Sequence, residues 1–127
     1  MNLLPGKNIL VIDDNINNSD VLKLCLEDAG YRVFIVASAL HGLEKIKTEK
    51  IDLIISDLAL PGLDGFGLLT ILKSDPLTKE IPVLILTNRD SRSELEEALK
   101  LGAVDCVVRY RNPPAALLKI VNTILNI

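Results

Sequence analysis

Residues 54–65 have the sequence Ile54-Ile55-Ser56-Asp57-Leu58-Ala59-Leu60-Pro61-Gly62-Leu63-Asp64-Gly65. A short apolar run ends here at a carboxylate, Asp57, and turn-forming residues follow it. This pattern is typical of a buried strand of a parallel sheet whose carboxyl end opens into a functional loop. The simpler interpretation is an aspartate that only caps the turn or the next helix. Acids at the end of another strand would favour the functional interpretation.

The rest of the chain repeats the same pattern, an apolar β-rich run followed by apolar residues at helical spacing. The predicted strands are residues 7–12, 31–36, 52–56, 81–86 and 103–108. We expect Asn17, Asn18 or Ser19 to cap the first helix. Strands that alternate with helices predict a parallel sheet covered on both faces. The sequence therefore indicates an α/β fold, with residues 1–127 as one domain.

Composition and charge exclude several classes of function. A net charge of -3 argues against nucleic-acid binding by this domain. No apolar run approaches the roughly 20 residues of a membrane helix, and the N-terminus lacks the features of a signal peptide. We therefore expect a cytoplasmic protein without membrane contact. Cys25, Cys106 and the single His41 have no partner ligands at metal-binding spacing, which predicts neither zinc nor a disulfide framework.

Polar and charged side chains follow four of the five predicted strands: Asp13 and Asp14, Asp57, Thr87, and Arg109. The carboxyl ends of parallel strands share one edge of a sheet, so we expect these side chains to converge. Three neighbouring carboxylates repel one another, which raises pKa values or recruits a cation. Oxygen ligands without histidine or cysteine favour Mg²⁺.

A carboxylate can also act as a nucleophile toward phosphorus and form an aspartyl phosphate. That reaction needs a metal ion and donors for the phosphoryl oxygens. Asp14 and Asp57 could hold the metal. The Thr87 hydroxyl and the Arg109 cation could contact the phosphoryl oxygens. The five positions together supply the parts for phosphoryl transfer onto Asp57.

Further residues around these positions carry a family resemblance. They are Ile9-Leu10-Val11-Ile12, Pro61, Asp64, Gly65, Ile81-Pro82-Val83-Leu84-Ile85-Leu86 and Gly102-Ala103-Val104-Asp105. In this order and spacing the chain resembles the receiver domain of response regulators, the CheY-like superfamily of two-component signalling. The resemblance, and not the spacing of the strands, implies a (βα)5 three-layer sandwich with strand order 2-1-3-4-5.

The resemblance also implies roles for individual residues. Asp57 is the phosphoacceptor by this likeness, and Thr87 is the switch hydroxyl. Asp14, Asp13, Asp57 and the backbone carbonyl of Ala59 are the implied Mg²⁺ ligands. The implied phosphoryl donor is a phosphohistidine on a sensor histidine kinase or a phosphotransfer protein. Such a protein is a signalling receiver and not an enzyme in the ordinary sense.

The resemblance implies that phosphorylation alters a surface formed by the fourth helix, the fifth strand and the fifth helix. A homodimer or an output partner would bind there. The charged candidates on this face are Glu94, Glu97, Lys100, Arg111 and Lys119. An ordinary solvated face is the alternative interpretation.

The sequence departs from the family pattern after the fourth strand and along the fifth. Arg109-Tyr110 stands where the family has Lys-Pro, and Asn88 replaces a small residue. Cys106 occupies the position of the aromatic switch residue and has no ring to move. A planar guanidinium does not reproduce the contact of an ammonium group. We expect a trans peptide bond before Tyr110, because a cis bond before a residue other than proline costs about 2.5–4 kcal/mol.

Two main hypotheses remain open. The first is a phosphorylatable receiver, and the second is a degenerate receiver that acts as a phosphorylation-independent protein-interaction module. A phosphatase of the haloacid-dehalogenase type needs Asp-x-Asp after the first strand, which Asp13-Asp14-Asn15 does not match. A flavodoxin needs a Ser/Thr/Gly-rich phosphate-binding loop there, which this sequence also lacks.

Overall fold

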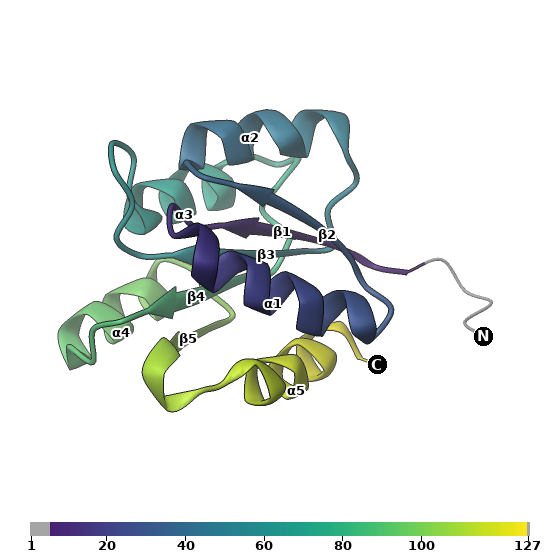
Figure 1. The fold of residues 1–127 in the computed structure, drawn as a ribbon. Helices are drawn as coiled ribbons and strands as arrows, with labels where there is room; N and C mark the ends of the chain where they lie inside the picture. Colours follow the sequence, from purple (N-terminus) through teal and green to yellow (C-terminus); the bar gives the residue numbers. More distant parts are fainter. Residues whose placement is uncertain (1–5, 127) are drawn as a thin grey trace.

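The computed structural model describes residues 6–126, which form one five-stranded parallel sheet with five α-helices (Figure 1). The strands are β1 (Asn8–Ile12), β2 (Arg32–Val36), β3 (Leu53–Asp57), β4 (Val83–Thr87) and β5 (Asp105–Val108). The helices are α1 (Ile16–Asp28), α2 (Ala39–Thr48), α3 (Gly65–Ser74), α4 (Arg92–Lys100) and α5 (Pro114–Leu125), with a 3-10 turn η1 (Arg109–Arg111) after β5. The strand order is β2-β1-β3-β4-β5, so the predicted α/β sandwich is confirmed.

The core consists of two apolar layers, one on each face of the sheet. Alternate residues of a strand point to opposite faces, so in β1 Leu10 and Ile12 pack with α2, α3 and α4. Ile9 and Val11 pack with α1 and α5 on the other face. Figure 1 shows the same division, with helices above and below the sheet. Because β1, β3 and β4 are almost wholly buried, their ends have little freedom to move.

All five predicted strands begin one or two residues before the strands of the structure, and the third and fourth also end one residue too early. β3 and β4 each extend one residue further, so that Asp57 and Thr87 are the last residues of their strands. β4 begins at Val83 because Pro82 has no N–H to donate, although its carbonyl still accepts from Ile54 at 3.0 Å. β5 begins at Asp105, two residues later than expected.

The predicted cap of the first helix is wrong. Asn15 caps α1, and its side chain accepts a hydrogen bond from the N–H of Asn18 at 3.2 Å. Ser19 lies inside the helix, where its hydroxyl donates to the carbonyls of Asn15 and Ile16. The helix therefore begins directly after the acidic pair that ends β1, and this short connection leaves no room for a later cap.

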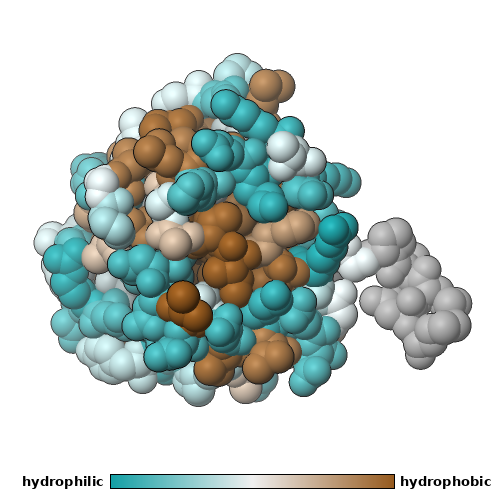
Figure 2. Space-filling model, turned by 45° about the horizontal axis from the view of Figure 1, so that its top comes forward, coloured by the Kyte–Doolittle hydropathy of each residue, from teal (hydrophilic) through white to brown (hydrophobic). Residues whose placement is uncertain are grey.

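Apolar side chains gather on the face formed by α2 and α3 (Figure 2). Leu40, Ile71 and Leu77 are exposed there. A hollow of about 510 Å³ between the helices is lined partly by Leu43 and Ile46. Among residues 6–126, none of the helices has both the length and the apolar composition to cross a membrane.

Candidate functional site

Three aspartates meet at the carboxyl edge of the sheet. Carboxylate oxygens of Asp13, Asp14 and Asp57 all lie within 4.8 Å of one another. The register between β1 and β3 explains this. Ile12 pairs with Ser56, and the next residue along each strand is an aspartate, so these two aspartates lie side by side. Asp13 is buried, Asp57 is half-buried and Asp14 is exposed. The predicted convergence of the acids is thus present.

Asp13 is already bonded on both oxygens. Its Oδ1 accepts from the N–H of Asn15 at 2.9 Å, and its Oδ2 accepts from the guanidinium of Arg109 at 3.0 Å. The two side chains of this ion pair are 1% and 14% exposed. The Nε of Arg109 is buried without a hydrogen-bond partner among the described residues. Arg109 therefore lies against the acidic cluster as its internal counter-ion.

Asp57 sits at a tightly packed strand end. Its Oδ1 accepts from the N–H of Ala59 at 3.3 Å. The start of α3 lies so close that a Cβ atom at Gly65 would be 2.8 Å from the Asp57 carbonyl oxygen. Burial raises the pKa of the Asp57 carboxyl, and the charge of Asp13 raises it further, while Ala59 and Arg109 act in the opposite direction. The predicted rise in pKa is therefore found at Asp57, with burial as its main cause.

The donor set fits a hard divalent cation. The cluster offers carboxylate oxygens from three residues and contains no sulfur or imidazole. Asp14 is open to solvent, so a hydrated ion can reach it. Asp13 is shared with Arg109, which leaves Asp14 and Asp57 as the more available ligands. The cluster is thus compatible with a Mg²⁺ site.

Thr87 lies beside the cluster, two strands from β1. It ends β4, is 2% exposed, and pairs with Val108 of β5. Its hydroxyl oxygen accepts from the N–H of Arg89 at 3.0 Å. Asn88, between them, is exposed. The connection from β4 to α4 is therefore tied to the Thr87 hydroxyl in this state.

The atypical residues of β5 and η1 have different surroundings. Cys106 is half-buried, and burial together with nearby Asp105 and Glu94 raises the pKa of its thiol to about 11. Tyr110 is 62% exposed. Residues 6–126 contain no cis peptide bond, so the predicted trans bond before Tyr110 is confirmed.

Asp90 is a site neighbour that the sequence did not identify. Its Oδ2 accepts from the Tyr110 hydroxyl at 3.0 Å and from the Arg111 guanidinium at 3.1 Å. Arg111, a candidate on the expected partner-binding face, is exposed and bonds to the loop between β4 and α4. The sequence offered only one signal for these contacts. It was an acid in the loop after β4, together with a turn after β5 that is rich in hydrogen-bond donors.

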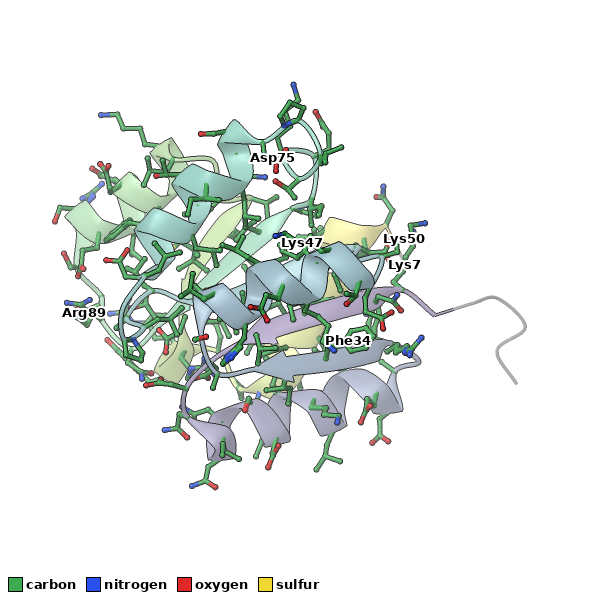
Figure 3. The ribbon with its side chains drawn as sticks, turned by 90° about the horizontal axis from the view of Figure 1, so that it is seen from above. Lys7, Phe34, Lys47, Lys50, Asp75 and Arg89 are labelled. Carbon is green, nitrogen blue, oxygen red and sulfur yellow. The ribbon has the colours of Figure 1, made fainter. Side chains whose placement is uncertain are left out.

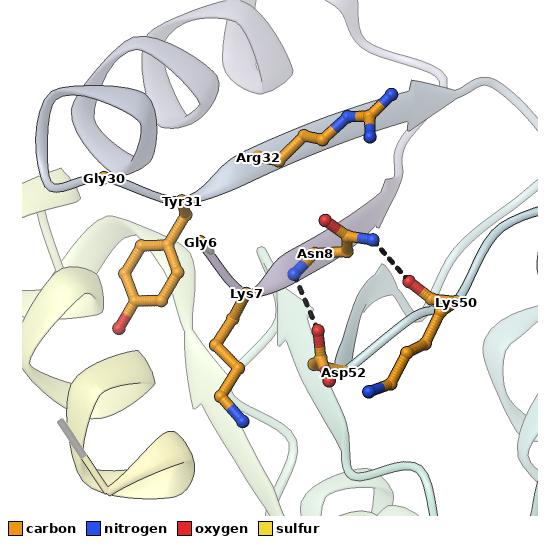
Figure 4. A pocket seen from close by; sticks show the side chains of 8 residues that line it. All are labelled: Gly6, Lys7, Asn8, Gly30, Tyr31, Arg32, Lys50 and Asp52. Atoms are coloured by element: carbon orange, nitrogen blue, oxygen red, sulfur yellow. Dashed lines mark hydrogen bonds between the residues drawn. The ribbon is translucent and has the colours of Figure 1, made fainter. Parts of the chain in front are cut away.

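The opposite edge of the sheet has a different character. Figure 3 shows Arg89 at one end of the molecule, and Lys7 and Lys50 at the other. The hollow at that far end has a volume of about 520 Å³ (Figure 4). There Asp52 accepts from the N–H of Asn8 at 2.8 Å, and the Asn8 side chain donates to the Lys50 carbonyl at 2.7 Å. These bonds join the starts of β1 and β3, and none of the predicted site residues lies there.

Known proteins are similar to this chain in both sequence and fold. Residues 9–122 match the model of the response regulator receiver domain. The transcriptional regulatory protein ZraR of Klebsiella oxytoca is 37% identical over 101 residues, which are 80% of this chain. The chain spans only 22% of the length of that relative.

Solved structures agree with the sequence match. A putative response regulator from Chloroflexus aurantiacus J-10-fl has a TM-score of 0.89 and 33% identity, over 96% of this chain and 99% of its own. The receiver domain of the sensor histidine kinase PA1611 from Pseudomonas aeruginosa PAO1, solved with a magnesium ion coordinated in the active site cleft, has a TM-score of 0.85 and 26% identity, over 96% and 99%. With the acidic cluster at the end of β1 and β3, these matches mean that the chain belongs to the response regulator receiver domain family, whose members are signalling modules of two-component systems rather than enzymes.

Proposed function

We propose that this chain is a phosphorelay receiver that accepts a phosphoryl group on Asp57, with Mg²⁺ held by Asp14, Asp57, Asp13 and the Ala59 carbonyl. The observation that carries the proposal is the meeting of three carboxylates within 4.8 Å beside a buried threonine hydroxyl. The donor would be a phosphohistidine of a sensor histidine kinase or a phosphotransfer protein. Action in the cytoplasm, with residues 1–127 forming one receiver domain, is part of the same proposal.

The half-buried carboxylate of Asp57 is the nucleophile. One of its oxygens forms a bond to phosphorus while the bond from phosphorus to the donor's imidazole nitrogen breaks, and that nitrogen keeps the electron pair. When bound, Mg²⁺ supplies positive charge that offsets the charge of the phosphoryl oxygens. Arg109, already 3.0 Å from Asp13, has to turn toward the new phosphoryl group to contact it. The Thr87 hydroxyl, whose oxygen accepts from the Arg89 N–H, donates its own hydrogen to a phosphoryl oxygen.

The second candidate is a degenerate receiver that binds partners without phosphorylation. The Arg109–Asp13 ion pair favours it, because a guanidinium at the cluster supplies part of the charge that a metal would bring. In either case the partner-binding surface is the face of α4, β5 and α5. Glu94 on this face pairs with Arg89 at 3.2 Å, so it is linked to the loop beside Thr87.

Acetyl phosphate with Mg²⁺, followed by intact-mass measurement, tests the proposal. We expect wild type to gain one phosphoryl group and Asp57→Asn to gain none. Asp64→Asn is a matched control, because Asp64 is an exposed acid near Asp57 that caps α3 outside the cluster. If wild type forms no adduct while Arg109→Lys does, the degenerate receiver is the better description. Full phosphorylation of Asp57→Asn would show that the acceptor is another residue.

A further inference from the structure

The turn η1 contacts both sides of the site through three consecutive residues. Arg109 bonds to Asp13 in the acidic cluster at 3.0 Å. Tyr110 and Arg111 both donate to the same oxygen of Asp90, at 3.0 and 3.1 Å. The Arg111 guanidinium also lies 5.4 Å from the centroid of the Tyr110 ring. One turn of backbone therefore connects the acidic cluster with the loop between β4 and α4.

Asp90 lies in the same short loop that holds the Thr87 hydroxyl. The neighbouring residue, Arg89, donates its N–H to that hydroxyl at 3.0 Å. The Arg89 side chain pairs with Glu94 of α4 at 3.2 Å. Adjacent residues share a peptide bond, so a backbone shift at Asp90 also acts on Arg89. The position of Asp90 thus bears on the bond that the Thr87 hydroxyl accepts from the Arg89 N–H.

We propose that Tyr110, Arg111 and Asp90 form a latch that couples Arg109 at the acidic cluster to the hydroxyl of Thr87. This inference rests on the proposed function and concerns the regulation of that same site. Tyr110 is a positioning residue in it, because it acts through Asp90 and not on the phosphoryl group. Its aromatic hydroxyl, carried by the turn after β5, provides a connection that Cys106 within β5 has no ring to make.

Entry of a cation into the cluster sets the direction of the change. The cation and the Arg109 guanidinium repel each other and compete for the Asp13 carboxylate. Arg109 moves away, and the adjacent Tyr110 moves with it because both belong to one 3-10 turn. The bonds to Asp90 are exposed, and pairs of this kind are favoured by only about two- to fivefold. A modest displacement of the turn therefore breaks the bonds to Asp90, and the loop that carries the Arg89 N–H can then move away from the Thr87 hydroxyl.

Tyrosine fluorescence gives a direct reading of the latch, because the chain has two tyrosines and no tryptophan. Tyr31→Phe removes the other tyrosine, whose hydroxyl bonds to Asn122 away from the site, and leaves Tyr110 as the only emitter. A hydroxyl that leaves a carboxylate changes its emission. We expect Mg²⁺ to change the emission of Tyr31→Phe and to leave the emission of Tyr31→Phe/Asp90→Ala unchanged. Unchanged emission of Tyr31→Phe, while the amide resonances of Asp14 and Asp57 shift with Mg²⁺, would overturn the latch.

A second measurement requires no metal. Arg109→Gln removes the cluster end of the connection, and we expect the amide resonances of Thr87 and Arg89 to shift in response. The same substitution in an Asp90→Ala background should shift them at most about half as far. Arg92→Gln serves as the background control, because it deletes another solvent-exposed ion pair, with Glu96 at 3.2 Å, that does not contact η1.

The two measurements separate this inference from the proposed function. Equal shifts of Thr87 and Arg89 with and without Asp90 overturn the latch, whatever acetyl phosphate does. Loss of the shifts in the Asp90→Ala background supports the latch even in a protein that forms no acyl phosphate. In that case the proposed phosphorelay function fails, and the latch remains as a connection within a degenerate receiver.

Discussion

The acidic side of the site and its switch side are built in different ways. Asp13 and Asp14 follow β1, and Asp57 ends β3; both are buried strands at the centre of the sheet. The switch side depends on the loop after β4 and the turn after β5, where Asp90, Tyr110 and Arg111 are all exposed. Buried strands fix the positions of the acids, whereas weak exposed bonds hold the switch side. The positions of the three aspartates can therefore stay constant while the switch side changes.

One ion pair joins the two sides. Arg109 belongs to the turn after β5, and its partner Asp13 belongs to the acidic cluster. Unlike the bonds of Asp90, this pair is largely shielded from solvent. A buried pair with a hydrogen bond on each partner is costly to break from one side. The substitutions below test whether this ion pair couples the acidic side to the switch side.

Asp13→Ala should have the largest effect. It leaves Arg109 buried with neither its acid partner nor a bond on Nε, and we expect the free energy of unfolding to fall by about 3–5 kcal/mol. Urea unfolding at neutral pH measures this loss. Asp13→Asn is the control, because an amide oxygen can still accept one of the two bonds and the loss should be smaller. A loss below about 1 kcal/mol would mean that Arg109 turns freely to solvent and that the two sides are not coupled through it.

Asp14→Ala should separate metal binding from stability. Asp14 is exposed, so we expect the free energy of unfolding to change by no more than about 0.5 kcal/mol. We expect the Kd for Mg²⁺ to rise at least about tenfold, because a ligand of the cluster is lost. Calorimetric titration with MgCl₂ measures the affinity. Asp20→Ala, an exposed acid on α1, is the control, and an equal effect there would show that general surface charge is responsible.

The acidic side was predictable because it follows from the position of strand ends. Periodicity and turn residues located the ends of β1 and β3, and a parallel sheet brings those ends together. An error of one residue in a strand boundary, as at Asp57 and Thr87, does not alter this outcome. The strand order came from the family resemblance, and the sheet agrees with it.

The pairings on the switch side could not be predicted in the same way. Arg109 and Asp13 are 96 residues apart, and Tyr110 and Asp90 are 20 apart. Which acid a long side chain reaches depends on its rotamer and on the path of the turn that carries it. The same limit explains Asn15, whose role as the cap of α1 depends on where the preceding loop ends.

Arg109→Gln should strengthen metal binding. The Arg109 guanidinium is bonded to Asp13, so it competes with a cation for the same carboxylate. We expect the Kd for Mg²⁺ to fall about two- to fivefold, as for a partly screened charge interaction. Arg109→Lys keeps the charge and should change the Kd less. A weaker Mg²⁺ affinity in Arg109→Gln would mean that Arg109 supports the metal site instead of competing with it.

Asp57→Asn should have only a small effect on stability, and its pH dependence carries the information. The pKa of Asp57 is raised by burial and by Asp13, so the folded protein holds a proton on this group more readily than the unfolded chain does. The ionised carboxylate therefore lowers stability once the pH exceeds the ordinary carboxyl pKa of about 4, and it does so fully above the raised pKa. We expect Asp57→Asn to raise the free energy of unfolding by about 1 kcal/mol or less at neutral pH, because the group is partly exposed.

The gain from Asp57→Asn should disappear as the pH falls below about 4, where the wild-type carboxyl is protonated in both states. Thermal unfolding across this range measures it, with Asp20→Asn as the exposed control. A gain that persists at low pH would mean that asparagine packs better at the strand end, and not that a charge was removed. A gain confined to higher pH would show that the ionised Asp57 carboxylate is destabilised at the strand end, mainly by its burial and further by the charge of Asp13. A cation bound beside this carboxylate would offset that cost, so the same buried geometry that costs stability would favour cation binding at the site.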